Sequence, residues 1–191
     1  MSNKIKFGIK GCHYAKATIA STGAATYGTP VALPGAVSIS MDAQGDQDVF
    51  YADNIGYYVT SPNNGYEGDL ELALIPDSFY KDILGYFTDV NGVLLEDANV
   101  EPAHFALTFQ FEGDENAVRH VLYNCVAKRP TLAGSTKEEN IDPQTETLSI
   151  VATTVYNSVL DKDIVKARCT PAQTAQYNSW NTTIYQTAST A

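Results

Sequence analysis

The chain contains 191 residues with a mass of 20.7 kDa, 18% of them charged and 44% hydrophobic, and its formal net charge is −10. A chain of this size can bury a sizeable core in one domain, and its composition excludes wholesale disorder. Because it has 22 acidic and only 12 basic residues, a broad basic surface that grips nucleic acid is disfavoured, whereas an acidic surface past which DNA slides without sticking is allowed.

The N-terminus and the cysteines bear on the cellular compartment. Residues 1–10 include lysines but no apolar segment typical of a signal peptide, and the longest aliphatic run is Leu72–Ile75. Cys12, Cys125 and Cys169 are widely spaced and form no Cys-x-x-Cys pair, which predicts reduced packing residues. We therefore expect synthesis and assembly in the cytosol, with no membrane insertion by this chain.

The first 35 residues predict an extended N-terminal arm. Short strands are expected near residues 5–9 and 13–19, and the small, polar stretch 21–30 cannot bury much surface. A half-buried strand follows at residues 37–42, where aliphatic and polar side chains alternate.

A hairpin with aromatic flanks is predicted between residues 49 and 60. Asp53-Asn54 is a turn signal between two short strands, and Asn63-Asn64-Gly65 is a second turn signal after them. The aromatic residues beside the first turn are Phe50, Tyr51, Tyr57 and Tyr58.

The next segment has the alternation of a strand with one buried and one solvated face. Every second residue from Gly68 to Leu74 is small or aliphatic, which places that face in a core. The acidic residues on the other face are Glu67, Asp69 and Glu71. A short helix should then begin at Pro76, with Asp77 as its cap, and stop at Gly85.

The second half of the chain predicts a long hairpin and a terminal helix. Large side chains alternate from Phe105 to Phe111, as in a central strand, and residues 118–129 return beside it. The polar loop 131–142 is long, and we expect it to make contacts. Strands at residues 145–156 and 164–169 should precede an amphipathic helix that opens with Thr170-Pro171-Ala172-Gln173.

These elements define a mainly β protein, a β-sandwich or barrel with one or two short flanking α-helices. We expect a single domain over residues 1–191. It would comprise the arm at 1–35, the β-sandwich at 36–170 and the C-terminal helix at 171–186.

Reactive chemistry finds little support in the sequence. His120 and Cys125 are an odd number of residues apart in one predicted strand, so they should face opposite sides of the sheet and cannot act as a base and nucleophile. Asp42, Asp46, Asp48 and Asp53 have the spacing of a calcium loop. Gln47, however, stands where that loop needs glycine, so a solvated acidic loop is favoured and no metal or cofactor is expected.

Several short stretches, in order along residues 4–170, resemble the major tail or tail tube proteins of siphophages, specifically the phi-thirteen family. The stretches are residues 6–10, 13–15, 34–36, 50–54, 64–71, 75–77, 82–85, 119–125 and 143–147. The resemblance implies a tail-tube-type β-sandwich that forms stacked hexameric rings, through which phage DNA passes without tight binding. The implied location is the virion tail, and the implied partners are other copies and the tape measure, terminator and distal tail proteins.

On this resemblance the predicted hairpin becomes a candidate for contacts between subunits. The candidate contact residues are Phe50, Tyr51, Asp53, Tyr57, Tyr58 and Lys137, and the candidate lumen residues are Glu67, Asp69 and Glu71. Two alternatives stay open. One is a head–tail connector or tail terminator that forms a single ring. The other is a carbohydrate-binding or enzymatic sandwich, for which the hairpin tyrosines and Asp53 would form the cleft.

Overall fold

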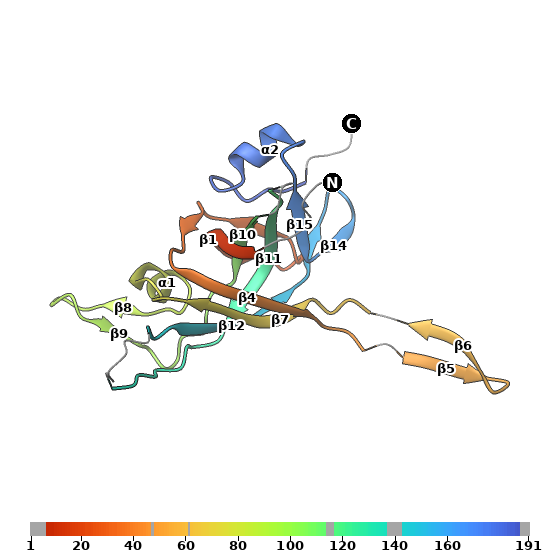
Figure 1. Cartoon of the computed structure of the whole chain (residues 1–191), viewed down its shortest axis with the longest axis horizontal. Coiled ribbons are helices and arrows are strands. Elements are labelled where there is room, and N and C mark those ends of the chain that lie inside the picture. The colour runs from red at the N-terminus through yellow and green to blue at the C-terminus, as the bar shows by residue number, and fades with distance from the viewer. Residues whose placement is uncertain (1–6, 47, 61, 114–116, 137–142, 188–191) are drawn as a thin grey trace.

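The computed structural model describes residues 7–46, 48–60, 62–113, 117–136 and 143–187. Antiparallel strands dominate this part of the chain and two short helices flank them, so the predicted mainly β class is confirmed (Figure 1). The strands are β1 (Phe7–Ile19), β2 (Ala25–Tyr27), β3 (Val31–Ala32), β4 (Ala36–Ala43), β5 (Asp48–Ala52), β6 (Ile55–Thr60), β7 (Tyr66–Leu72), β8 (Phe87–Thr88), β9 (Leu94–Leu95), β10 (Phe105–Glu112), β11 (Arg119–Ala127), β12 (Glu146–Thr153), β13 (Val155–Asn157), β14 (Lys162–Ile164) and β15 (Lys166–Cys169). The helices are α1 (Asp77–Asp82) and α2 (Thr174–Ser179).

The main sheet forks at β11. Its path runs β2-β1-β10-β11-β12-β7-β4, with β3 paired to β1. Residues 124–127 of β11 pair with β12, whereas residues 119–122 pair with β15. The fork separates the β12-β7-β4 branch from β15, so the two branches can enclose a core between them.

The main core lies between these strands and is closed by α1. Phe79 of α1 is fully buried, and its ring packs edge-on against Tyr14 of β1 and Phe105 of β10, at centroid distances of 5.1 and 5.5 Å. The helix is where the sequence predicts it, but the capping prediction was wrong. Pro76 is its N-cap residue and no side chain caps it.

The described part of the predicted arm belongs to the sheet. β1 pairs with β10 from Phe7 to Lys16, and Tyr14, Ala15 and Leu33 are buried. β1 is covered on both faces, because Tyr14 joins the main core and Ala15 joins a second cluster behind the sheet. Small residues fit this second layer, which explains why a segment poor in large side chains is nonetheless packed.

The second cluster holds the C-terminal segment. Gln173 accepts a hydrogen bond from the Thr170 backbone N–H at 2.9 Å, but α2 begins only at Thr174 and is shorter than the expected 171–186. Trp180 and Ile184, which lie beyond the helix, are buried in the cluster. Packing therefore orders this segment without a continuous helix.

Leu74 differs from its prediction. β7 ends at Leu72, the chain bends, and the Ile75 N–H donates to Glu146 Oε2 at 2.7 Å. Ile75 is then buried and Leu74 is 68% exposed. The alternation of buried and exposed residues therefore ends where β7 stops pairing with its neighbouring strands.

Among the described residues, no helix is long and apolar enough to cross a membrane. The division of the chain into one domain over residues 1–191 stays a prediction.

Candidate functional site: an aromatic hairpin and a polar sheet face

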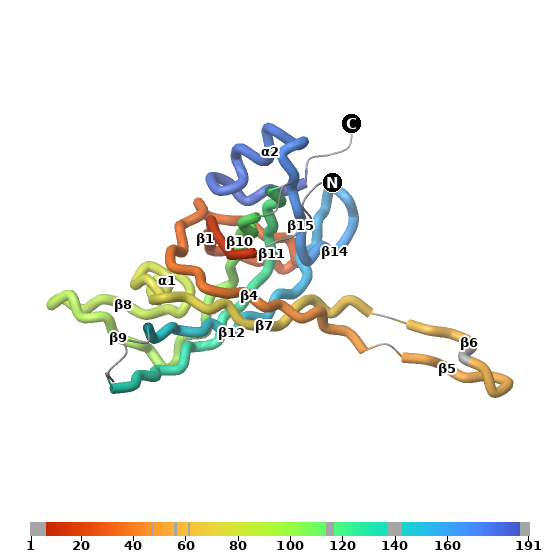
Figure 2. Tube along the Cα trace, viewed as in Figure 1, coloured from red at the N-terminus to blue at the C-terminus, as the bar shows by residue number. Residues whose placement is uncertain are grey.

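The β5–β6 hairpin extends away from the body of the molecule (Figures 1 and 2). It continues the ribbon of β4 and β7, since Gln44 N–H donates to Gly65 O and Asn64 N–H donates to Gln44 O, each at 2.9 Å. Its turn is Asp53-Asn54, with φ of 52° and 59°. Positive φ at both central residues is the mark of a type I′ turn, whose twist matches that of the two strands. The predicted hairpin is confirmed.

Large apolar side chains on this hairpin are open to solvent. Tyr57 is 72% exposed and Tyr51 69%, and Phe50 lies directly across the ribbon from Tyr58. The exposed set is Phe50, Tyr51, Ile55, Tyr57, Tyr58 and Val59. An isolated two-stranded ribbon is marginal in water, and contiguous exposed apolar surface marks an interaction site. The hairpin therefore has the properties of a segment that becomes packed by a partner.

The structure brings the predicted hairpin residues together, Asp53 at the tip and four aromatic residues along the strands. Ile55 and Val59 were not predicted as contact candidates. Their place in the same alternating aromatic stretch was the signal that could have found them. Lys137, the remaining contact candidate, lies outside the described residues.

The acidic residues of β7 line one polar face of the β4-β7-β12 sheet. Ser149 Oγ donates to Asp69 at 2.7 Å, and Lys128 Nζ lies 3.3 Å from Glu67. Glu71 accepts hydrogen bonds from Thr145 at 2.6 Å and Ser38 at 2.8 Å. Hydroxyl groups on β4, on β12 and just before β12 thus hold Asp69 and Glu71 in place.

These contacts favour charge on this face. The hydroxyls of Thr145 and Ser38 lower the pKa of Glu71, because a hydrogen bond to the ionised form stabilises it. The opposite face of β7 carries Leu70 and Leu72, both fully buried. The three strands therefore form a sheet with one apolar face on the core and one anionic, hydroxyl-rich face open to solvent.

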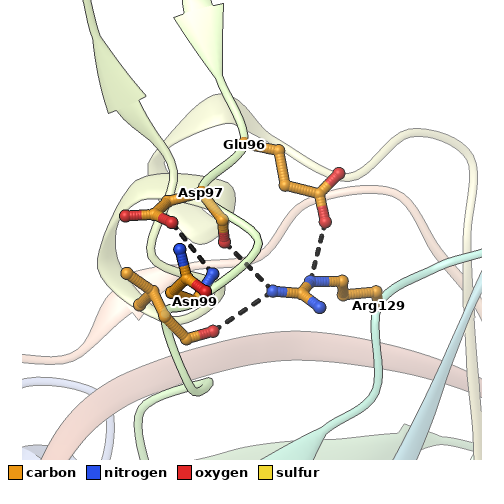
Figure 3. Close-up of polar contacts among 5 residues, drawn as sticks. Glu96, Asp97, Asn99 and Arg129 are labelled. Atoms are coloured by element: carbon orange, nitrogen blue, oxygen red, sulfur yellow. Dashed lines mark hydrogen bonds and ion pairs between the residues drawn. The ribbon is translucent and has the colours of Figure 1, made fainter.

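Arg129 contacts the segment that follows a second protruding hairpin, β8–β9. Its Nε lies 2.7 Å from Glu96, and its Nη2 donates to the carbonyl oxygens of Asp97 at 3.2 Å and Val100 at 3.1 Å (Figure 3). Asp97 also accepts from the Asn99 N–H at 2.9 Å. One guanidinium therefore ties the segment after β9 to the end of β11.

Comparison with known protein families identifies the family to which this chain belongs. The sequence model of the family described as phage tail tube protein matches residues 1–185. The chain belongs to the phage tail tube protein family. This tail tube protein is a structural protein of the virion tail, as the resemblance predicts. No curated protein sequence matches the tail tube protein.

Among solved structures, the tail tube protein is similar to a chain in the cryo-EM structure of the anti-feeding prophage cap, the AFP tube terminating cap. The identity is 12% and the TM-score 0.39, over 87% of this chain and 93% of that chain. At a TM-score below 0.5, this likeness supports no conclusion about fold or function.

The strand parity predicted for His120 and Cys125 of the tail tube protein was wrong. A bulge in β11 interrupts its register with β10 after Leu122, so Cys125 and the ring partners of His120 belong to the same core cluster. His120 stacks on Phe109 with centroids 5.3 Å apart. Cys125 is fully buried, and burial raises the pKa of its thiol. A protonated, enclosed thiol is a poor nucleophile, so both residues are packing residues.

The four aspartates of the calcium-like spacing are spread along the ribbon of the tail tube protein. Asp42 lies on β4, Asp46 in the following loop, Asp48 on β5 and Asp53 at the hairpin tip. No group of three or more His, Cys, Asp or Glu side chains within the described ranges could hold a metal ion.

Proposed function

We propose that this tail tube protein is the major tail subunit, which assembles into stacked hexameric rings that form the tube for phage DNA. The observation that carries the proposal is the β5–β6 hairpin, which presents aromatic surface far from its own core. Aromatic residues with a polar end are favoured in protein interfaces. The hairpin would be the contact between successive rings.

The free edge of β4 supports the ring. β4 is the last strand of the sheet path and pairs with β7 alone among the described residues. An unpaired strand edge invites uncontrolled pairing unless another strand covers it. Joining sheets edge to edge around a closed ring removes every such edge, and head-to-tail contacts that close by rotation give rings.

The anionic face of β4-β7-β12 supports a lumen for DNA. Non-specific affinity for DNA comes chiefly from lysine and arginine contacts to phosphate. A wall that carries Glu67, Asp69 and Glu71, with hydroxyls between them, offers few such contacts, so DNA would stay mobile.

We also propose a structural, non-enzymatic role, with assembly in the host cytoplasm. We further propose contacts with the tape measure, terminator and distal tail proteins.

Negative-stain imaging and sedimentation of purified protein test this function. The wild type should form tubes with an axial hole, whereas a Tyr57→Ser and Tyr58→Ser double variant should form none. Both side chains are largely exposed, so the variant should melt within about 2 °C of wild type, as surface changes do. Val159→Ser is the matched control, because Val159 is a 50% exposed residue away from the hairpin, and it should form tubes.

Three outcomes would contradict the proposal or its assignment of the hairpin. Isolated rings that never stack would indicate a connector or terminator, and a wild type that stays monomeric at every concentration would contradict any tube role. Normal tubes from the hairpin double variant would remove the hairpin from the contact between rings.

A further inference from the structure

A groove of about 340 Å³ opens at the fork of the main sheet, between β4 and β7 on one side and β10, β11 and β15 on the other. Its lining includes Ile39, Tyr66, Phe109, Phe111, His120 and Lys166. Phe109 is buried in the main core, whereas Ile39, Tyr66 and Phe111 are only partly covered, and β12 pairs with residues 124–127 of β11 but not with residues 119–122. The groove is therefore a shaped opening into the apolar interior.

Aromatic rings line the groove, and one lysine, Lys166, lies beside them. His120 packs on Phe109 and, with centroids 5.7 Å apart, against Phe111. Lys166 Nζ lies 4.2 Å from the centre of the Tyr66 ring. Arg168, the cross-strand partner of His120 on β15, is exposed but lines a separate pocket with Trp180 and Tyr185. An occupant that combines apolar rings with negative charge would match this surface.

The β5–β6 hairpin has that chemistry. The hairpin carries Asp48 and Asp53, and the stretch from Asp42 to Gly65 that contains it has no lysine, arginine or histidine. Four of its exposed apolar side chains are aromatic, and the hairpin points away from the body that contains the groove of its own chain (Figure 1). The occupant would therefore come from another copy.

We propose that the fork groove receives the β5–β6 hairpin of a second copy of this chain, with hairpin aromatic residues against Phe111 and Tyr66 and a hairpin aspartate beside Lys166. This inference rests on the proposed tube function and names the receiving surface. A heterologous contact of this kind, donor ribbon to acceptor groove, extends without limit along one direction and so builds a stack.

The β8–β9 hairpin is the competing receiver, since Phe87, Val90 and Val93 are exposed on it. This hairpin, however, carries acidic residues, and its neighbouring cation, Arg129, is already engaged by Glu96 and two carbonyls. Like charges placed opposite each other are unfavourable in an interface. Charge complementarity therefore favours the fork groove.

Cysteine cross-linking tests the pairing directly. Purified Tyr57→Cys and Lys166→Cys proteins are mixed at assembly concentration and oxidised mildly, and the disulfide-linked dimer is measured on a non-reducing gel. The native cysteines are buried, and burial raises the pKa of Cys12 to about 12, so they should not compete. The mixture should give about tenfold more dimer than either variant alone, because docking holds the two thiols together.

Val93→Cys replaces Lys166→Cys as the matched partner on the competing surface. It should give no more dimer with Tyr57→Cys than the single variants do. Cross-linking to Val93→Cys in place of Lys166→Cys would overturn the assignment of the groove.

Charge reversal gives an independent readout. Lys166→Glu should raise the protein concentration needed for half-maximal tube formation by about tenfold, as expected for a lost complementary charge. Lys162→Glu, the same change on the exposed strand β14, should alter it by less than about twofold. Equal effects of the two variants would contradict the groove assignment.

These tests separate the inference from the function on which it rests. If the wild type forms no tubes, the tube function fails. If the wild type forms tubes, the hairpin variant does not, and Lys166→Glu assembles normally, then only the groove assignment fails.

Discussion

Replacing Leu72 or Leu74 by alanine distinguishes the strand that the sequence pattern predicts from the strand that the structure contains. The two leucines have the same parity, but Leu72 is fully buried and Leu74 is 68% exposed. Leu→Ala removes three carbons, which is about 2.4 kcal/mol of transfer free energy for a fully buried side chain, and a cavity term adds to it. Leu72→Ala should therefore cost about 3 kcal/mol.

Leu74→Ala is the matched control. About one third of its side chain is covered, so the same reasoning gives a loss of less than about 1 kcal/mol. For a chain of this size, a loss of 1 kcal/mol lowers Tm by about 2–4 °C. Differential scanning calorimetry under non-assembling conditions should thus show Leu72→Ala about 6–12 °C below wild type and Leu74→Ala within about 4 °C. Equal shifts, or a larger shift for Leu74→Ala, would refute the bend after Leu72.

Two further changes test the sheet and the β8–β9 hairpin. A Cβ on Gly68 would collide with the carbonyl oxygen of Ser40 in β4, so Gly68→Ala should lower the free energy of unfolding by about 1–3 kcal/mol, while Gly134→Ala, which meets nothing within 4 Å, should leave chemical denaturation unchanged. Arg129→Met removes the contacts to Glu96 and two carbonyls and should cost about 1–2 kcal/mol, with faster amide exchange confined to residues 86–100. Uniform protection across that segment in Arg129→Met would show that the guanidinium does not hold it.

Signals confined to neighbouring residues predicted the hairpin and the central strands correctly. Asp53-Asn54 accommodates the positive φ values of a tight turn, and the aromatic residues beside it favour strands, so the ribbon follows from local chemistry. The same holds for β10 and β11, where long alternation and the turn after Glu112 define the pairing. The polar face of β7 was likewise predicted correctly, from acidic residues that alternate with small or aliphatic residues in the sequence.

The errors arose where long-range packing overrides local pattern. One bulge in β11 brings His120 and Cys125 to the same face of the sheet, and the residues between them give no sequence signal for it. Tyr14 and Ala15 belong to a central strand because layers form on both faces of β1, which a sequence poor in large side chains does not reveal. Likewise, Trp180 is fixed by the cluster it enters and not by the helix that precedes it.

The sequence by itself determined the mainly β class, the aromatic hairpin and the anionic strand face, because turn chemistry and side-chain alternation depend on residues that are adjacent in the chain. The tertiary structure alone decided that the main sheet forks at β11 and leaves a cationic, aromatic groove there. That groove gathers side chains from five strands between Ile39 and Lys166, and only the folded chain brings residues so distant in sequence into one surface.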